Sequence, residues 1–171
     1  LLDAIANERA LMADLRSEAD VILDTSGLNV HQLHAKVSLL LDATVGSRVR
    51  LAVMSFGFKY GVPLDADFVM DMRFLPNPFW IPELRAKAGT DPAVADYVLG
   101  QAGATAFLDR AMALFEPVLE GYLREGRRYV TLAIGCTGGK HRSVAITEAL
   151  AARFDPERVV AFVVHRDLGR E

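Results

Sequence analysis

A glycine-rich loop between an apolar run and a helical pattern most constrains how this chain can fold. Residues 129–134 predict a buried strand, and residues 144–154 predict a helix. The sequence between them reads Gly135-Cys136-Thr137-Gly138-Gly139-Lys140-His141-Arg142-Ser143. A strand that leads through glycines into a helix presents unpaired backbone N–H groups and the positive end of the helix dipole. This arrangement is typical of a site for phosphate or another anion.

Further strands and helices alternate along the chain on both sides of this loop. We expect strands over residues 49–56, 68–75 and 159–165. We expect helices over residues 92–99, with Asp91 as the N-cap, and 105–125. Alternating strands and helices predict an α/β fold, with a mostly parallel sheet and flanking helices.

The first part of the chain has the pattern of a separate unit. Residues 1–18 predict one amphipathic helix, residues 21–23 a short buried strand, and Asn29 the cap of a second helix. Gly46-Ser47 marks a boundary, so residues 1–45 are interpreted as the end of an upstream domain and residues 48–171 as a second domain. Because the chain starts with Leu1 inside a helical pattern, we expect it to be a fragment of a longer protein.

Composition excludes several classes of protein. The formal net charge of -3 gives no overall attraction to nucleic acid. No apolar run approaches the roughly 20 residues that span a bilayer. Cys136 is the single cysteine, which excludes an internal disulfide and fits a reducing compartment. His31 and His34 lack the further ligands of a metal site, so we expect no metal.

Nucleotide hydrolysis by this loop is disfavoured. A Walker A motif requires G-x-x-x-x-G-K-[ST], in which the hydroxyl after the lysine holds Mg²⁺. Ile134 stands where the first glycine is needed, and His141 stands where the hydroxyl is needed.

A second interpretation is cysteine-dependent phosphatase chemistry. Cys136, Arg142 and Ser143 fit C-x5-R-[ST], which resembles the phosphate loop of tyrosine phosphatases, where a thiolate attacks phosphorus. Such an enzyme also needs an aspartic general acid from another loop. The candidates for this acid are Asp65, Asp67 and Asp71. We favour the simpler interpretation that Cys136 is a small buried residue at a strand end.

A third interpretation is binding of an anion without chemistry. Arginine suits a bidentate grip on phosphate, and histidine holds negative charge when protonated. The alternative is a tight turn whose charges face water. The predicted ligand set is Thr137, Gly138, Gly139, Lys140, His141, Arg142 and Ser143.

Two neighbouring strand ends supply further candidates. The carboxyl ends of parallel strands share one edge of a sheet, where ligands bind. Ser55 and Lys59 follow the first strand of the second domain, and Arg73 and Asn77 lie around the end of the next. Asp71 and Arg73 can also simply pair with each other. For the adjacent aromatic residues Phe79 and Trp80, we favour core packing over an interface patch.

These segments together resemble the RapZ family of bacterial nucleotide-binding proteins. The resemblance lies in Ser55-Phe56-Gly57-Phe58-Lys59-Tyr60-Gly61, in Asp65-Ala66-Asp67, in Arg73-Phe74-Leu75-Pro76-Asn77-Pro78 and in residues 135–144. Asp24-Thr25-Ser26 resembles the end of that family's N-terminal domain.

The resemblance implies a cytoplasmic two-domain protein. It implies an N-terminal kinase-like P-loop domain with ATPase and GTPase activity, so that ATP or GTP would be a cofactor of the full-length protein and none is expected in this chain. It also implies a C-terminal α/β domain, similar to part of a phosphofructokinase, that senses an amino-sugar phosphate or UDP-N-acetylglucosamine and forms homo-oligomers. The best-known member presents small RNAs to a ribonuclease and so controls amino-sugar synthesis.

The family's anion pocket carries over to Thr137, Gly138, His141 and Arg142. Two positions depart from the family pattern. Phe79 stands where the family often has a histidine, and the chain ends in Asp167-Leu168-Gly169-Arg170-Glu171 rather than a basic tail. The donor lost at Phe79 favours a different choice of ligand, and the missing basic tail disfavours RNA binding. From the resemblance we expect a ligand-binding regulatory domain that is not itself catalytic, with a small RNA or a regulatory protein as its partner.

Overall fold

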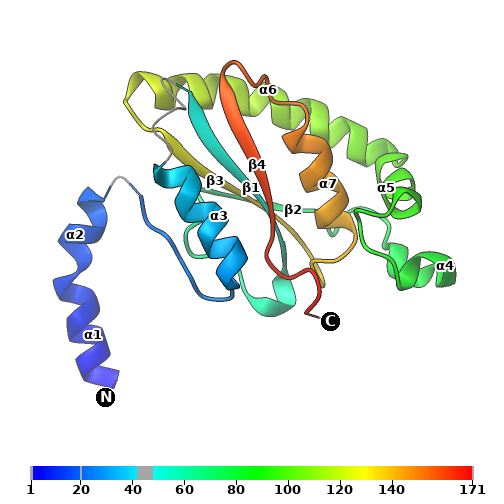
Figure 1. Cartoon of the computed structure of the whole chain (residues 1–171). Helices are drawn as coiled ribbons and strands as arrows, with labels where there is room; N and C mark the ends of the chain where they lie inside the picture. Colours follow the sequence, from blue (N-terminus) through cyan, green and yellow to red (C-terminus); the bar gives the residue numbers. More distant parts are fainter. Residues whose placement is uncertain (1, 20, 42–47, 171) are drawn as a thin grey trace.

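A four-stranded parallel sheet forms the centre of the protein (Figure 1). A computed structural model describes residues 2–19, 21–41 and 48–170. The strands are β1 (Val49–Gly57), β2 (Phe68–Asp71), β3 (Tyr129–Cys136) and β4 (Val159–His165). They lie in the order β2-β3-β1-β4, and every neighbouring pair is parallel. The predicted α/β fold is confirmed.

Helices fill the connections between the strands. The long helices α6 and α7 follow β2 and β3, and Asp91 caps α5 as predicted by accepting a hydrogen bond from the Ala93 amide. No helix in the described ranges is long and apolar enough to cross a bilayer. The helices are α1 (Leu2–Leu11), α2 (Ala13–Glu18), α3 (Val30–Leu41), η2 (Phe58–Tyr60), η3 (Pro78–Trp80), α4 (Pro82–Arg85), α5 (Pro92–Leu99), α6 (Ala102–Arg124) and α7 (Arg142–Ala151).

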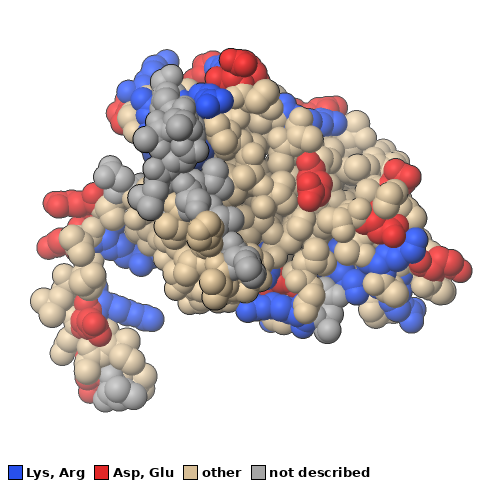
Figure 2. Space-filling view, viewed as in Figure 1, with Lys and Arg blue, Asp and Glu red and all other residues tan. Residues whose placement is uncertain are grey.

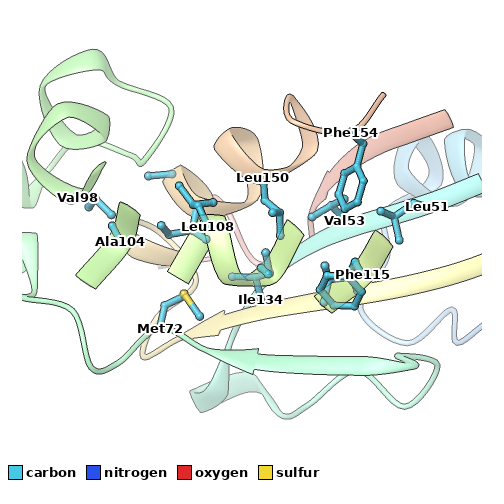
Figure 3. Packing of buried hydrophobic residues seen from close by; sticks show 14 of the residues in the cluster. Leu51, Val53, Met72, Val98, Ala104, Leu108, Phe115, Ile134, Leu150 and Phe154 are labelled. Carbon is cyan, nitrogen blue, oxygen red and sulfur yellow. The ribbon is translucent and has the colours of Figure 1, made fainter. Parts of the chain in front are cut away.

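The core lies between one face of the sheet and the helices α5, α6 and α7 (Figure 3). Side chains alternate across a strand, so Leu51 and Val53 of β1 and Ile134 of β3 point to this face. Phe115 of α6 and Leu150 of α7 are buried against them. Full burial of each such side chain stabilises the fold by about 1.5–3 kcal/mol.

The order of the strands places a crevice at one edge of the sheet. The β1–β2 connection moves across the sheet in the direction opposite to the β2–β3 and β3–β4 connections. Because crossovers between parallel strands are right-handed, the β1–β2 connection passes over the face of the sheet opposite to α6 and α7, where α3 also lies (Figure 1). The chain therefore leaves the adjacent strands β1 and β3 toward opposite faces. Such a switch point opens a crevice at the carboxyl ends of the strands.

The N-terminal segment differs from its prediction. The expected single helix over residues 1–18 is two helices that meet at Met12. None of the residues described in these two helices is buried. The expected strand over residues 21–23 is not a strand, because no neighbouring strand pairs with it and β4 and β2 form the sheet edges. The predicted boundary at Gly46-Ser47 lies outside the described residues.

The predicted cap at Asn29 is confirmed, and the predicted end of the second strand at Leu75 is wrong. Asn29 does begin α3 in a reciprocal capping box, in which the side chains of Asn29 and Gln32 each accept a hydrogen bond from the other residue's amide at 2.9 Å. The strand predicted to run to Leu75 ends at Asp71, because the Asp71 carboxylate turns the backbone by accepting from the Arg73 amide at 2.9 Å.

Candidate functional site

A cavity of about 500 Å³ opens at the carboxyl edge of the sheet. The loops after β1 and β3 meet there, and the Lys59 amide donates a hydrogen bond to the Thr137 carbonyl at 3.2 Å. This is the crevice expected from the strand order. The cavity is lined by Lys59, Asn77, Phe79, Trp80, Arg85, Cys136, Thr137, Gly138, Lys140, His141 and Arg142.

Close backbone packing beneath the cavity requires glycines in the loop. Gly139 has a φ of 78°, and a Cβ atom there would lie 2.7 Å from the Gly57 nitrogen. A Cβ atom on Gly57 would lie 2.6 Å from the Gly138 carbonyl carbon. The Gly57 amide in turn donates to the buried Asp167 carboxylate at 2.8 Å. The loop therefore rests directly on the end of β1.

Arg142 forms the buried end of the cavity, because only 4% of its surface is exposed. Its guanidinium donates to the carbonyls of Leu75 at 2.9 Å and Arg73 at 3.3 Å, and to the Thr137 hydroxyl at 3.2 Å. Its Nε is buried without a hydrogen-bond partner. Among the described residues, no carboxylate lies within ion-pair distance of it. A buried positive charge held only by neutral acceptors is poorly compensated, and a bound anion would compensate it.

The remaining charges around the cavity have the same sign. Four of the lining residues are Lys or Arg and none is Asp or Glu. Figure 2 shows basic side chains along the lower edge of the molecule, over α4 and near the C-terminus. His141 is buried, with Nε2 3.2 Å from the Arg85 carbonyl, so Nε2 carries the proton in this contact. Within the described ranges, no group of three or more His, Cys, Asp or Glu residues is placed to hold a metal ion.

Cys136 is buried, as the favoured interpretation predicted, and only 3% of the residue is exposed. Its Sγ lies 3.1 Å from the hydroxyl of Ser143, which is also buried. The three candidate acids lie away from the cavity lining in ion pairs. These pairs are Asp65 with Lys36, Asp67 with Arg127, and Asp71 with Arg73.

The ion pair of Asp71 shifts its acidity. The pKa of Asp71 lies below its ordinary value, chiefly because the Arg73 side chain donates hydrogen bonds to the carboxylate. The Arg73 backbone amide and the charges of Arg73 and Arg142 lower it further, and partial burial opposes them. The expected pairing of Asp71 with Arg73 is confirmed. Arg73 also stacks over the Phe58 ring at 4.0 Å, and it is not among the residues that line the cavity.

The structure brings most of the predicted ligand residues together at the cavity. Those that line it are Lys59, Asn77, Thr137, Gly138, Lys140, His141 and Arg142. Ser55, Arg73, Gly139 and Ser143 are not part of the lining. Ser55 is buried in the sheet and its hydroxyl bonds His165 Nδ1 at 2.8 Å. Gly139 lies beneath the loop, on Gly57.

Sequence reasoning missed one lining residue and misjudged two others. Arg85 lies in the short helix α4, and its only sequence signal is Pro82 at the helix start. Phe79 and Trp80 are exposed at the cavity mouth, so the prediction that they pack in the core is wrong. The prolines on either side, Pro78 and Pro82, begin the short helices η3 and α4.

The fold and the cavity define a parallel α/β protein with a cationic crevice at the carboxyl edge of its sheet. Its sequence matches the RapZ C-terminal domain over residues 49–169 and the RapZ-like N-terminal domain over residues 1–44. The chain therefore belongs to the RapZ family of nucleotide-binding proteins.

Relatives from several actinobacteria are similar over the whole chain. A nucleotide-binding protein of Streptomyces coelicolor is 57% identical over 171 residues, which is all of this chain and 57% of the relative. Nucleotide-binding proteins of Frankia alni and Saccharopolyspora erythraea are 57% and 59% identical, and the chain covers 59% of each. The chain thus spans less than two thirds of the length of these relatives.

Proposed function

We propose that this protein is a regulatory domain that binds the phosphate of an amino-sugar phosphate or a nucleotide sugar. The phosphate lies against residues 137–142. The observation that carries this proposal is the buried Arg142 guanidinium, which faces a 500 Å³ cavity and has no carboxylate partner among the described residues. Arginine binds phosphate oxygens through two parallel N–H donors, and these charge-assisted bonds are strong.

Ligand binding regulates self-association and the binding of a small RNA or a regulatory protein. The cationic lower edge supports an anionic partner, although the whole chain carries a net charge of -3. This loop lacks the residues of a Walker A motif, so we assign ATP or GTP binding and hydrolysis to the complete cytoplasmic protein and not to this site. The names of the relatives as nucleotide-binding proteins support nucleotide binding.

The test is calorimetric titration of the wild-type chain and of Arg142→Ala with glucosamine-6-phosphate and UDP-N-acetylglucosamine. Loss of a charge-assisted contact weakens binding by roughly 10- to 150-fold. Arg153→Ala is the matched control, because Arg153 is exposed and pairs with Asp109 far from the lining residues. Unchanged affinity in Arg142→Ala would place the ligand elsewhere.

A second variant guards against misfolding, because Arg142 also holds two backbone carbonyls of the segment after β2. Thr137→Val removes the hydroxyl that accepts from Arg142 at 3.2 Å, but it leaves both carbonyl contacts of Arg142 to that segment in place. We expect it to weaken binding while the melting temperature without ligand changes little. Absence of binding by the folded wild-type chain to both ligands contradicts the proposal.

A second candidate function, phosphate ester hydrolysis, draws on one observation. The Ser143 hydroxyl is positioned to donate to the Cys136 sulfur at 3.1 Å, which would stabilise a thiolate beside Arg142. The thiolate would displace an alcohol from phosphorus, and water would then release the phosphate. This function requires that the wild-type chain hydrolyses p-nitrophenyl phosphate and that Cys136→Ser does not. We expect none, because the three candidate general acids lie away from the cavity lining and are held in ion pairs.

A further inference from the structure

Two aromatic side chains stand exposed at the mouth of the cavity. Trp80 is 73% exposed and Phe79 is 43% exposed. Their rings form an edge-to-face pair with centroids 5.3 Å apart, and both line the cavity. Large aromatic residues contribute most when they are buried, and an exposed pair beside a cavity indicates a contact surface.

The exposure of this pair is built into the local structure. The Asn77 carboxamide accepts a hydrogen bond from the Phe79 amide at 3.3 Å. Arg85 Nε donates to the Phe79 carbonyl at 2.9 Å, and the guanidinium stacks over the Phe79 ring at 4.9 Å. Pro78 is buried and fixes the start of η3. Phe79 is thus held in place before any ligand arrives, and the Trp80 ring packs against it edge to face.

The size of the cavity shows what kind of ligand fits. A cavity of about 500 Å³ is within the range of pockets for organic ligands. An inorganic phosphate needs only a few times the roughly 30 Å³ that one water molecule occupies. Most of the cavity is therefore available to an organic group attached to the phosphate.

Burial gives the direction in which such a ligand lies. Arg142, His141 and Cys136 form the buried end of the lining, and Trp80 and Phe79 form the exposed end. A phosphate on Arg142 therefore directs the rest of its molecule toward the aromatic pair.

We propose that Phe79 and Trp80 form a ring subsite, in which the flat face of a ring in the ligand stacks on the exposed Trp80 ring, while Phe79, whose ring is nearly perpendicular to that of Trp80, borders the stacked ring. This proposal depends on the proposed function, because the phosphate of the same ligand binds Arg142. The ligand is a phosphate ester that carries a ring. A pyranose presents apolar C–H groups on one face, and a nucleobase presents a π-face. Both rings suit the same aromatic surface, and the experiment distinguishes them.

The chain contains its own probe for this subsite, because Trp80 is its single tryptophan. Fluorescence of Trp80 is followed during titration with inorganic phosphate, glucosamine-6-phosphate and UDP-N-acetylglucosamine. We expect the ring-bearing ligands to change the emission and to bind more tightly than inorganic phosphate. A response to glucosamine-6-phosphate identifies the pyranose as the stacked ring. A response to UDP-N-acetylglucosamine that UDP reproduces identifies the nucleobase.

Calorimetry of variants completes the test. Trp80→Ala should weaken the ring-bearing ligand by roughly 5- to 150-fold and leave inorganic phosphate unchanged. The variant should keep its fold because Trp80 is exposed. Trp80→Phe should retain part of the affinity. Phe74→Ala, at an exposed aromatic residue outside the cavity lining, is the matched control and should change neither.

The outcomes separate the subsite from the proposed function. If Arg142→Ala abolishes binding while Trp80→Ala leaves every affinity unchanged, the phosphate site stands and the ring subsite is overturned. If the folded wild-type chain binds neither phosphate nor its esters, both proposals are overturned.

Discussion

The Asp167 carboxylate accepts a hydrogen bond from the Gly57 amide, with 2.8 Å between Oδ2 and the nitrogen. Asp167 is fully buried just after β4, and it also binds the guanidinium groups of Arg166 and Arg170. Gly57 is in contact with Gly139 of the loop. One buried carboxylate thus connects the end of β4, the end of β1 and the loop that lines the cavity.

Asp167→Ala should destabilise the protein by about 3–5 kcal/mol, because it leaves the buried charge of Arg166 and the Gly57 amide without their partner. Urea denaturation measures this change. Asp167→Asn, which keeps an acceptor oxygen for Gly57, should lose less. The control is Asp109→Ala at an exposed ion pair with Arg153, with an expected loss of at most about 1 kcal/mol. Equal losses at the buried and exposed sites would contradict this role.

Gly139→Ala tests the close packing of the loop on β1. The left-handed backbone alone costs an alanine about 1–2 kcal/mol, and the added Cβ would lie 2.7 Å from the Gly57 nitrogen. Gly126→Ala is a matched control, because its φ is 79° and nothing lies within 4 Å of its Cβ position. The melting temperature should fall clearly further in Gly139→Ala. Equal decreases would show that the loop can move away from β1 at no cost.

A buried ion pair between Lys36 and Asp65 joins the two family-matched segments of the chain. Asp65 also accepts a hydrogen bond from the Asp24 amide at 3.2 Å. Lys36→Met should destabilise the protein by about 3–5 kcal/mol in denaturant unfolding, because it leaves the Asp65 charge buried and unpaired. The double variant Lys36→Met, Asp65→Leu should recover part of this loss. A double variant less stable than Lys36→Met would rule out the unpaired charge as the cause.

Acid should remove the contribution of Asp71. Arg73 lowers the pKa of folded Asp71 below the unfolded value of 3.8, so the ion pair stabilises the protein above that pH. The stabilisation is lost as the pH falls below 3.8 and through the folded pKa. Unfolding free energies of the wild type and Asp71→Asn should therefore differ at pH 7 and converge in acid. A difference that stays constant down to the lowest pH at which both proteins fold would show that Asp71 contributes through packing.

Local sequence patterns were sufficient to predict the sheet and several helix ends. The apolar run of β4 and the Asp91 cap of α5 depend on neighbouring residues, and both are where the sequence predicts them. The cavity walls depend on distant residues. Arg142 reaches the Leu75 carbonyl across 67 positions, and Ser55 bonds His165 across 110. No local pattern contains such contacts, so the sequence indicated most of the lining residues but neither the contribution of Arg85 nor the exclusion of Ser55.

The three neutral acceptors on Arg142 have a consequence for the kinetics of binding. They fix the guanidinium between the segment after β2 and the loop after β3 while the cavity is empty. A site held in this way does not have to rearrange before it accepts a ligand. Association should then be a single bimolecular step, whose observed rate rises linearly with ligand concentration and shows no plateau.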